Sequence, residues 1–188
     1  MPIPTADAVR EIVGLGLTEA VQRLFSQLDE ADNQALCARY STVFRRDQDE
    51  PCQLFDGVRN SLEELRDAGF LLAVATGKSR NGLRRAMQEL QMEDLFTASR
   101  CADETRSKPH PLMLLELLEQ LAVAPAQALM VGDTLHDLNM ATNAGVASIA
   151  VDYGAHSRAR LLSAAPLAYI SRFSDIKIHI KKYFTELN

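Results

Sequence analysis

From Pro51 onward, short apolar segments alternate with segments of helical periodicity, and this alternation limits the fold more than any other feature of the chain. The candidate strands are Phe70–Ala75, Phe96–Ala98, Ala128–Val131, Ala147–Val151 and Leu167–Ile170. The candidate helices are Val58–Ala68, Asn81–Leu90, Pro111–Leu121, Asp137–Ala144 and Ser157–Leu162. Strands that alternate with helices form a parallel sheet with helices on both faces. The sequence therefore predicts an α/β fold with a Rossmann-like parallel sheet for residues 51–188.

Residues 1–50 have a different texture, with apolar residues at the three- and four-residue spacing of helices. Gly14-Leu15-Gly16 interrupts this pattern, and a charged segment that ends at Pro51 has the composition of a linker. We therefore predict a small helical unit over residues 1–50 and the α/β unit over residues 51–188. At the other end of the chain, the spacing of Ile176, Ile178 and Ile180 fits either a strand or a helix.

The charge balance and the cysteines exclude several classes of protein. Lys and Arg number 20 against 25 Asp and Glu, a formal net charge of −5, which argues against a non-specific grip on nucleic acid. The apolar stretches are shorter than the ~20 residues that span a bilayer, and no signal pattern is visible, so no membrane is expected as a partner. The three cysteines are too few and too scattered for a disulfide framework, which favours a cytoplasmic location.

Polar residues follow the predicted strands at the ends where a parallel sheet binds its ligands. Thr76-Gly77-Lys78 follows the first strand, Lys108-Pro109 opens a helix, and Gly132-Asp133 begins a polar segment that ends at Asp137. A hydroxyl and backbone N–H groups donate to phosphate oxygens, a lysine neutralises their charge, and carboxylates hold a hard divalent metal. These residue types together indicate phosphoryl-transfer chemistry.

Three motifs in this order resemble those of the haloacid dehalogenase superfamily, and the phosphoglycolate-phosphatase-like branch is the most similar. They are A-T-G-K at 75–78, S-K-P at 107–109 and V-G-D-T-L-H-D at 131–137. The resemblance implies a Rossmann-like core with a small helical cap, of which residues 1–50 would be part. It also implies a Mg²⁺-dependent phosphatase that acts on a small phosphorylated metabolite through an aspartyl-phosphate.

Carried over residue by residue, the resemblance assigns roles to the strand-end residues. Thr76 and Gly77 would bind phosphate, and Lys108 would stabilise the charge of the phosphoryl group. Asp133 would be a Mg²⁺ ligand. Asp137 would either act on the metal through water or orient Lys108.

The family's first motif, D-x-D-G-T after a first strand, does not occur in these 188 residues. That motif supplies the nucleophilic and the acid/base aspartates, and its strand lies between those that end at Thr76 and before Asp133. We therefore expect free strand edges on both sides of its place and no turnover by this chain. The alternative is a non-catalytic relic, or a protein that binds a metabolite or a partner.

Some features of the sequence leave alternatives open. His136 has the character of a surface or packing residue more than of a metal ligand, because Mg²⁺ prefers oxygen. The segment Tyr153–His156 fits a plain turn and equally a contact with substrate or cap. Neither the substrate nor the oligomeric state follows from the sequence.

Overall fold

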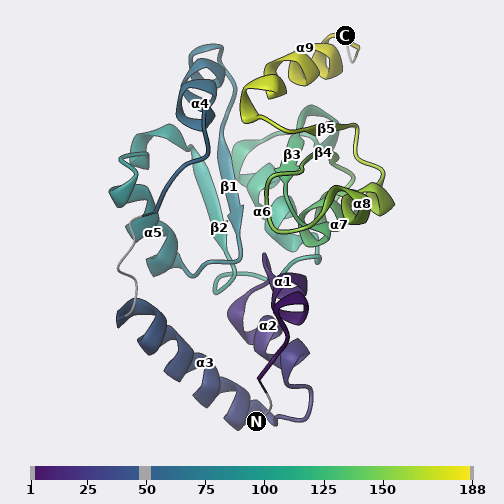
Figure 1. The fold of residues 1–188 in the computed structure, drawn as a ribbon. Helices are drawn as coiled ribbons and strands as arrows, with labels where there is room; N and C mark the ends of the chain where they lie inside the picture. Colours follow the sequence, from purple (N-terminus) through teal and green to yellow (C-terminus); the bar gives the residue numbers. More distant parts are fainter. Residues whose placement is uncertain (1–2, 47–51, 187–188) are drawn as a thin grey trace.

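The computed structural model describes residues 3–46 and 52–186 (Figure 1). The N-terminal helices are α1 (Ala6–Ile12), α2 (Leu17–Leu24) and α3 (Glu30–Arg46). The remainder runs α4 (Val58–Asp67), β1 (Ala73–Thr76), α5 (Arg80–Glu89), β2 (Ala98–Cys101), α6 (Leu112–Leu121), β3 (Leu129–Gly132), α7 (Leu135–Asn143), β4 (Ala147–Val151), α8 (Arg158–Leu161), β5 (Ala168–Ile170) and α9 (Ile176–Glu186), with 3₁₀ turns at Glu93–Leu95, Pro125–Gln127, Leu162–Ala164 and Phe173–Asp175. The predicted boundary between residues 50 and 51 lies outside the described residues.

The strands form two parallel sheets, one of β1 and β2 and the other in the order β3-β4-β5. Figure 1 shows β1 as the strand of its sheet nearer to β3. Within residues 3–46 and 52–186, no strand pairs with the second edge of β1 or of β3. These are the two strand edges that were expected from the sequence to be free.

Two apolar clusters cover opposite faces of the sheets and hold them together. One joins β2, α6 and α7 through Ala98, Met113 and Met140, with Ala75 of β1 and Met130 of β3 packed against it. The other joins α4, β4, β5 and α9, and its buried members are Leu65, Ile149, Val151, Ile170, Ile176 and Ile180. Helices thus lie on both faces, and the predicted α/β fold is confirmed.

Some elements have other bounds in the structure than the sequence predicted, and one alternative that the sequence left open is decided. The strand expected at Phe96–Ala98 is wrong in position, because the observed strand β2 is Ala98–Cys101. Ser99 and Arg100 are polar, so the sequence of β2 lacks the apolar pattern used to predict strands. Arg100 is satisfied there by Glu116 at 3.0 Å and Gln120 at 2.8 Å. The helix expected from Asp137 begins two residues earlier, at Leu135, because Thr134 is its N-cap residue. The C-terminal isoleucines, whose spacing fitted either a strand or a helix, belong to helix α9.

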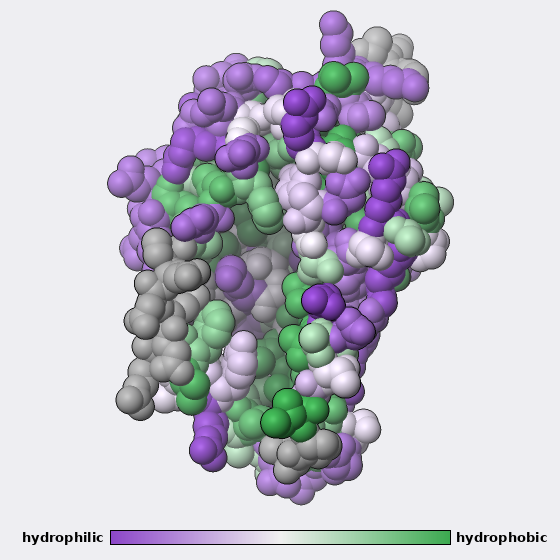
Figure 2. Space-filling model, viewed as in Figure 1, coloured by the Kyte–Doolittle hydropathy of each residue, from purple (hydrophilic) through white to green (hydrophobic). Residues whose placement is uncertain are grey.

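The N-terminal helices lie at the carboxyl ends of the strands (Figure 1). Thr5 caps α1, since its hydroxyl accepts the N–H of Ala8 at 3.2 Å. The Gly14-Leu15-Gly16 break separates α1 from α2, as the sequence predicted, and Gly14 has a φ of 93° that favours glycine. The space-filling view shows apolar residues along a hollow in the middle of the face that Figure 1 presents (Figure 2). Among the described helices, none combines the length and the apolar character needed to cross a membrane.

Candidate functional site

The motif residues lie at the carboxyl ends of strands in both sheets. Thr76 is the last residue of β1, and Asp133 directly follows β3. Lys108 precedes α6 in the segment that leaves β2, and Asp137 lies in the first turn of α7. The parallel order of the strands therefore places all four at one end of the two sheets.

Lys108 and Asp137 form a buried ion pair that joins the two sheets. The Lys108 Nζ lies 2.6 Å from the Asp137 Oδ1, and both side chains are 6% exposed. The same ammonium donates to the carbonyl oxygen of Ala75 in β1 at 2.9 Å. A buried charge pair is tolerated when hydrogen bonds satisfy its donors and acceptors, and these contacts occupy two of the three N–H groups of the ammonium. The ammonium is thus held in place at the ends of β1 and β3.

The second carboxylate oxygen of Asp137 is also occupied. Thr134, the N-cap residue of α7, donates to Oδ2 from its backbone N–H at 3.2 Å and from its hydroxyl at 2.7 Å. The Asp137 N–H in turn donates to the Thr134 hydroxyl at 3.2 Å. Of the two roles considered for Asp137, this geometry matches the one that orients Lys108.

Asp133 lies against the turn that follows β4. Its Oδ2 accepts the backbone N–H of Ala155 at 2.8 Å, and its carbonyl oxygen accepts the N–H of His156 at 3.2 Å. A Cβ atom on Gly154 would lie 2.2 Å from the same Oδ2, so only glycine fits at that position. The turn thereby fixes the direction of the Asp133 carboxylate.

The described side chains do not by themselves fit a magnesium site. Mg²⁺ takes octahedral oxygen coordination and usually needs more than one anionic ligand or a bound phosphate. In residues 3–46 and 52–186, no group of three His, Cys, Asp or Glu side chains could hold a metal. Asp133 is the one motif carboxylate with an unoccupied oxygen, because Asp137 is saturated by Lys108 and Thr134.

Thr76 and Gly77 form the turn after β1. The Thr76 hydroxyl accepts the N–H of Lys78 at 3.1 Å. The N-terminal loop lies directly on Gly77: a Cβ there would be 2.5 Å from the carbonyl oxygen of Leu15 and 2.7 Å from that of Gly14. The turn therefore needs glycine for close approach, and the N-terminal loop covers it.

The segment before Lys108 also contacts that loop. The hydroxyl of Ser107 accepts the backbone N–H of Gly16 at 2.9 Å. The loop at 14–16 thus meets residues that follow both β1 and β2. The sequence gives no separate signal for this role of Ser107, because its partner lies 91 residues away.

His136 is a packing residue, as the sequence indicated. It is buried, and its Nε2 lies 2.8 Å from the carbonyl oxygen of Glu11 in α1. Burial, with the guanidinium of Arg23 as a smaller cause, lowers the pKa of His136 to about 4. The ring is therefore neutral near pH 7 and fastens α1 to α7.

The sequence left Tyr153–His156 open as a plain turn or as a contact with substrate or cap, and the contacts of His156 bear on this choice. The Nδ1 of His156 accepts the N–H of Leu135 at 3.0 Å, and its Nε2 lies 3.2 Å from the carbonyl oxygen of Arg10. His156 therefore connects the start of α7 with the last turn of α1. The segment contacts the helical unit, which was one of the alternatives.

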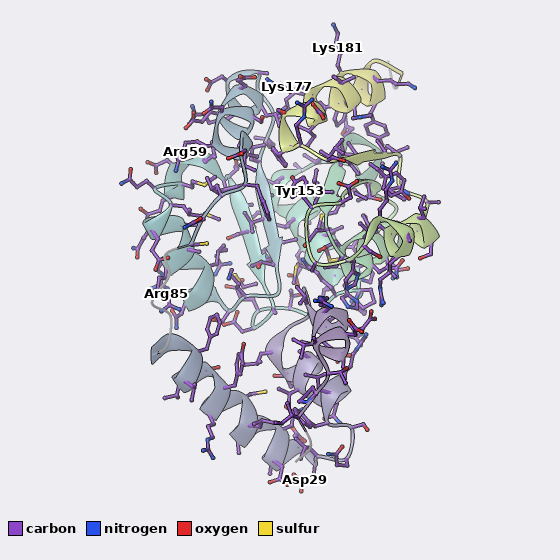
Figure 3. All side chains as sticks on the ribbon, in the orientation of Figure 1. Asp29, Arg59, Arg85, Tyr153, Lys177 and Lys181 are labelled. Atoms are coloured by element: carbon purple, nitrogen blue, oxygen red, sulfur yellow. The ribbon has the colours of Figure 1, made fainter. Side chains whose placement is uncertain are left out.

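Tyr153 is half-buried and lies near the centre of the view, whereas Asp29, Arg85 and Lys181 lie at its periphery (Figure 3). Its ring packs edge-on against Phe55, with centroids 4.8 Å apart. Burial raises the pKa of Tyr153 to about 12, with smaller contributions from Asp133 and Asp152. The phenol is thus neutral near Asp133.

The fold and the strand-end residues together define an α/β protein whose helical unit covers a lysine, a threonine and an aspartate at one end of parallel sheets. Residues 1–151 match the family described as haloacid dehalogenase-like hydrolase. The chain belongs to this family.

The relatives that this chain resembles are phosphatases by name. It is 33% identical over 180 residues to "Probable phosphatase IndB" of Dickeya dadantii, covering 94% of this chain and 78% of that protein. It is 29% identical over 153 residues to pyrophosphatase PpaX of Bacillus cereus, covering 81% of this chain and 71% of that protein. A solved structure described as a predicted phosphoglycolate phosphatase from Haemophilus somnus has the same fold, with a TM-score of 0.81, 24% identity and coverage of 95% and 84%.

Proposed function

We propose that this chain binds the phosphoryl group of a small phosphorylated metabolite at the carboxyl ends of β1 and β3. The observation that carries the proposal is the Lys108 ammonium, which is 6% exposed on its side chain and fixed by Asp137 and Ala75. A preoriented charge stabilises a transferring phosphoryl group more than a mobile one, because it needs no reorganisation. The matching donors are the Thr76 hydroxyl and the Gly77 N–H, which directly follow Ala75 in the chain.

The proposed reaction class is that of a magnesium-dependent phosphatase similar to phosphoglycolate phosphatase. Phosphatase names among the relatives support the class. Because the described residues offer one available carboxylate, at Asp133, we propose that magnesium binding requires further ligands. The cysteines Cys37, Cys52 and Cys101 are free thiols, which suits the reducing cytoplasm proposed as its location.

We further propose that the 188-residue polypeptide binds phosphate without turnover. Lys108 and Thr76 can stabilise a phosphoryl group, but neither is placed here to accept it covalently. Of the carboxylates near the site, Asp137 is saturated by hydrogen bonds and Asp133 is held by the turn after β4. A protein that binds a metabolite or partner without catalysis is the second candidate, and the absence of D-x-D-G-T from the sequence favours it for this polypeptide.

The test combines binding and hydrolysis. Calorimetry with tungstate, an analogue of phosphate, is expected to detect binding that Thr76→Ala and Lys108→Ala each weaken at least tenfold. Lys182→Ala, at an exposed position of α9, is expected to leave it unchanged. Thr76→Ala disturbs no buried ion pair, so it remains informative if Lys108→Ala does not fold. Absence of tungstate binding, or binding that both variants retain, contradicts the proposed site.

Hydrolysis of an aryl phosphate with magnesium then separates the two candidates. The chain is expected to be inactive, and a version with a strand carrying D-x-D-G-T placed before residue 1 is expected to turn over. If that version also stays inactive, the binding protein is the better account. Turnover by the unextended chain that disappears in Lys108→Ala would overturn the claim that the nucleophile is missing.

A further inference from the structure

Arg80 connects two loops that the proposed function uses. It is the first residue of α5, directly after the turn that contains Thr76 and Gly77. Its guanidinium donates to both carboxylate oxygens of Glu104, at 2.7 and 2.5 Å. It also donates to the hydroxyl of Ser99 at 2.6 Å and to the carbonyl oxygen of Ser99 at 3.1 Å. Such a two-pronged pair is among the strongest and most directional contacts that a side chain makes.

Backbone contacts reinforce this connection. The Arg80 N–H donates to the Asp103 Oδ1 at 2.9 Å, and the Ala102 N–H donates to the Lys78 carbonyl oxygen at 3.0 Å. The Cys101 N–H donates to the Glu104 Oε2 at 3.0 Å. Residues 101–104 are therefore fastened to the start of α5 at several points.

The charges of this pair are more shielded from water than those of ordinary surface pairs. Arg80 and Glu104 are 34% and 33% exposed, against 48% and 67% for Arg66 and Asp67 in α4. The hydrogen bond from Arg80 lowers the pKa of Glu104 to about 2. The pair thus stays charged throughout the pH range in which a phosphate ester is bound.

The segment between Glu104 and Lys108 depends on such an anchor. The hydroxyl of Thr105 is buried and has no hydrogen-bond partner, and burying an unpaired hydroxyl costs free energy. The conformation of this segment is therefore imposed by its ends. One end is the Arg80–Glu104 pair, and the other is the Lys108–Asp137 pair.

We infer that Arg80 and Glu104 are positioning residues, which hold the segment of Lys108 against the turn of Thr76 and Gly77 and so fix the spacing of the groups that bind phosphate. The inference rests on the proposed function. Neither residue touches the phosphoryl group in this account. Their effect reaches the ligand through the positions of Lys108 and Thr76.

Whether Glu104→Gln raises or lowers the affinity for tungstate distinguishes a positioning role from a direct effect of the Glu104 charge on the anion. Removing a negative charge near an anion site strengthens anion binding if only the field matters. Loss of the two-pronged pair weakens binding if position matters. Positioning predicts that tungstate binds about tenfold more weakly to Glu104→Gln and to Arg80→Gln. It also predicts that the double variant is no weaker than either single one, because both residues act as one unit.

The measurements are calorimetric tungstate titrations of these variants, with Arg66→Gln as the control for loss of an arginine–carboxylate pair. The ¹⁵N resonance of the Lys108 ammonium is recorded in parallel and is expected to shift in the Arg80 and Glu104 variants but not in the control. Urea unfolding confirms that each variant folds, and Glu104→Gln alone decides the matter if Arg80→Gln does not fold.

The outcomes separate this inference from the proposed function. Wild-type chain that binds no tungstate contradicts the proposed function, and the inference falls with it. Wild-type chain that binds tungstate, together with a Glu104→Gln variant that binds it equally or more tightly, overturns the inference alone.

Discussion

The Asp137 carboxylate orients Lys108 because hydrogen bonds from Thr134 fix the carboxylate itself. Its two oxygens accept hydrogen bonds from Lys108 and Thr134, and its side chain is 6% exposed. Gly132 makes room for it, because a Cβ there would lie 2.3 Å from the Asp137 Cβ. At the scale of single residues, the site is therefore a buried ion pair with the hydrogen-bond partners that such a pair needs.

Replacing Asp137 is expected to destabilise the protein as well as the site. Asp137→Asn leaves the Lys108 ammonium buried without its counter-charge, which costs about 3–5 kcal/mol in comparable cases. The free energy of unfolding from urea denaturation measures this. Asp67→Asn in an exposed pair is the control, with an expected change below about 1 kcal/mol. Equal effects of the two substitutions would show that the buried pair has no special weight.

Because Arg80 lowers the pKa of Glu104, we expect the stability that this pair contributes to depend on pH. The pKa of Glu104 is lowered to about 2 from 4.5, so its contribution is fully present above about pH 4.5 and is lost as the pH falls toward 2. The difference in unfolding free energy between wild type and Glu104→Gln is therefore expected to be largest near pH 7 and to shrink steadily as the pH falls from about 4.5 through about 2. Urea denaturation at several pH values tests this, and a difference that does not change with pH would refute it.

The sequence motifs alone indicate Thr76, Gly77, Lys108, Asp133 and Asp137, because each follows a strand or opens a helix. The pairing of Arg80 with Glu104 could not be predicted in the same way. Those residues are 24 positions apart and belong to different loops, so only the folded chain brings them together. The sequence left two roles open for Asp137 for the same reason, since its hydrogen bonds depend on the position of Lys108.

At the scale of elements, helix α1 is held to the α/β unit by the rings of His136 and His156. The ring of His136 lies near the carbonyl oxygen of Glu11, and the ring of His156 lies near that of Arg10, which also accepts the N–H of the C-cap residue Val13. The interface is thus specific to the end of one helix. The sequence predicted the helix, but its partners lie 125 and 146 residues away and could not be predicted.

Removing one ring is expected to loosen α1. His156→Ala loses contacts with Leu135 and Arg10, so amide exchange of residues 5–16 is expected to rise about tenfold while that of β4 stays unchanged. Hydrogen exchange followed by mass spectrometry provides the measurement, and His179→Ala in α9 is the control. Unchanged exchange over residues 5–16 would mean that the rings do not secure the helix.

The strands show where local pattern succeeds and where it fails. Ala147–Val151 was predicted at its observed bounds, because its residues are mostly buried and apolar. The strand at Ala98–Cys101 was misplaced because it lies at a sheet edge and includes Ser99 and Arg100. Edge strands have one side open to polar partners, so their sequence does not stand out.

At the scale of the whole molecule, two parallel sheets are joined by helices rather than by strand pairing. Helices α6 and α7 contribute Met113, Leu117 and Met140 to a cluster that Ala75 and Met130 of the two sheets also contact. Alternation in the sequence predicted the layers and the helices on both faces. The ion pair of Lys108 adds a polar connection at the carboxyl ends of the strands.

Met113 is fully buried in this cluster and tests its importance. Met113→Ala is expected to lower the free energy of unfolding by about 2–5 kcal/mol, because it leaves a cavity in the cluster that Ala75 and Met130 also contact. Leu115→Ala on the same helix is the control, since Leu115 is 42% exposed and should change stability much less. A loss below about 1 kcal/mol for Met113→Ala would show that the sheets are held together elsewhere.

The central claim is that phosphate binds where Thr76, Gly77 and Lys108 meet, and a crystal structure with tungstate tests it most directly. The carbonyl oxygens of Gly14 and Leu15 lie against Gly77, so the N-terminal loop is expected to move away when the oxyanion enters. We predict a tungstate ion whose oxygens accept hydrogen bonds from the Thr76 hydroxyl, the Gly77 N–H and the Lys108 ammonium. Tungstate bound at another place, with these three groups untouched, would contradict the account.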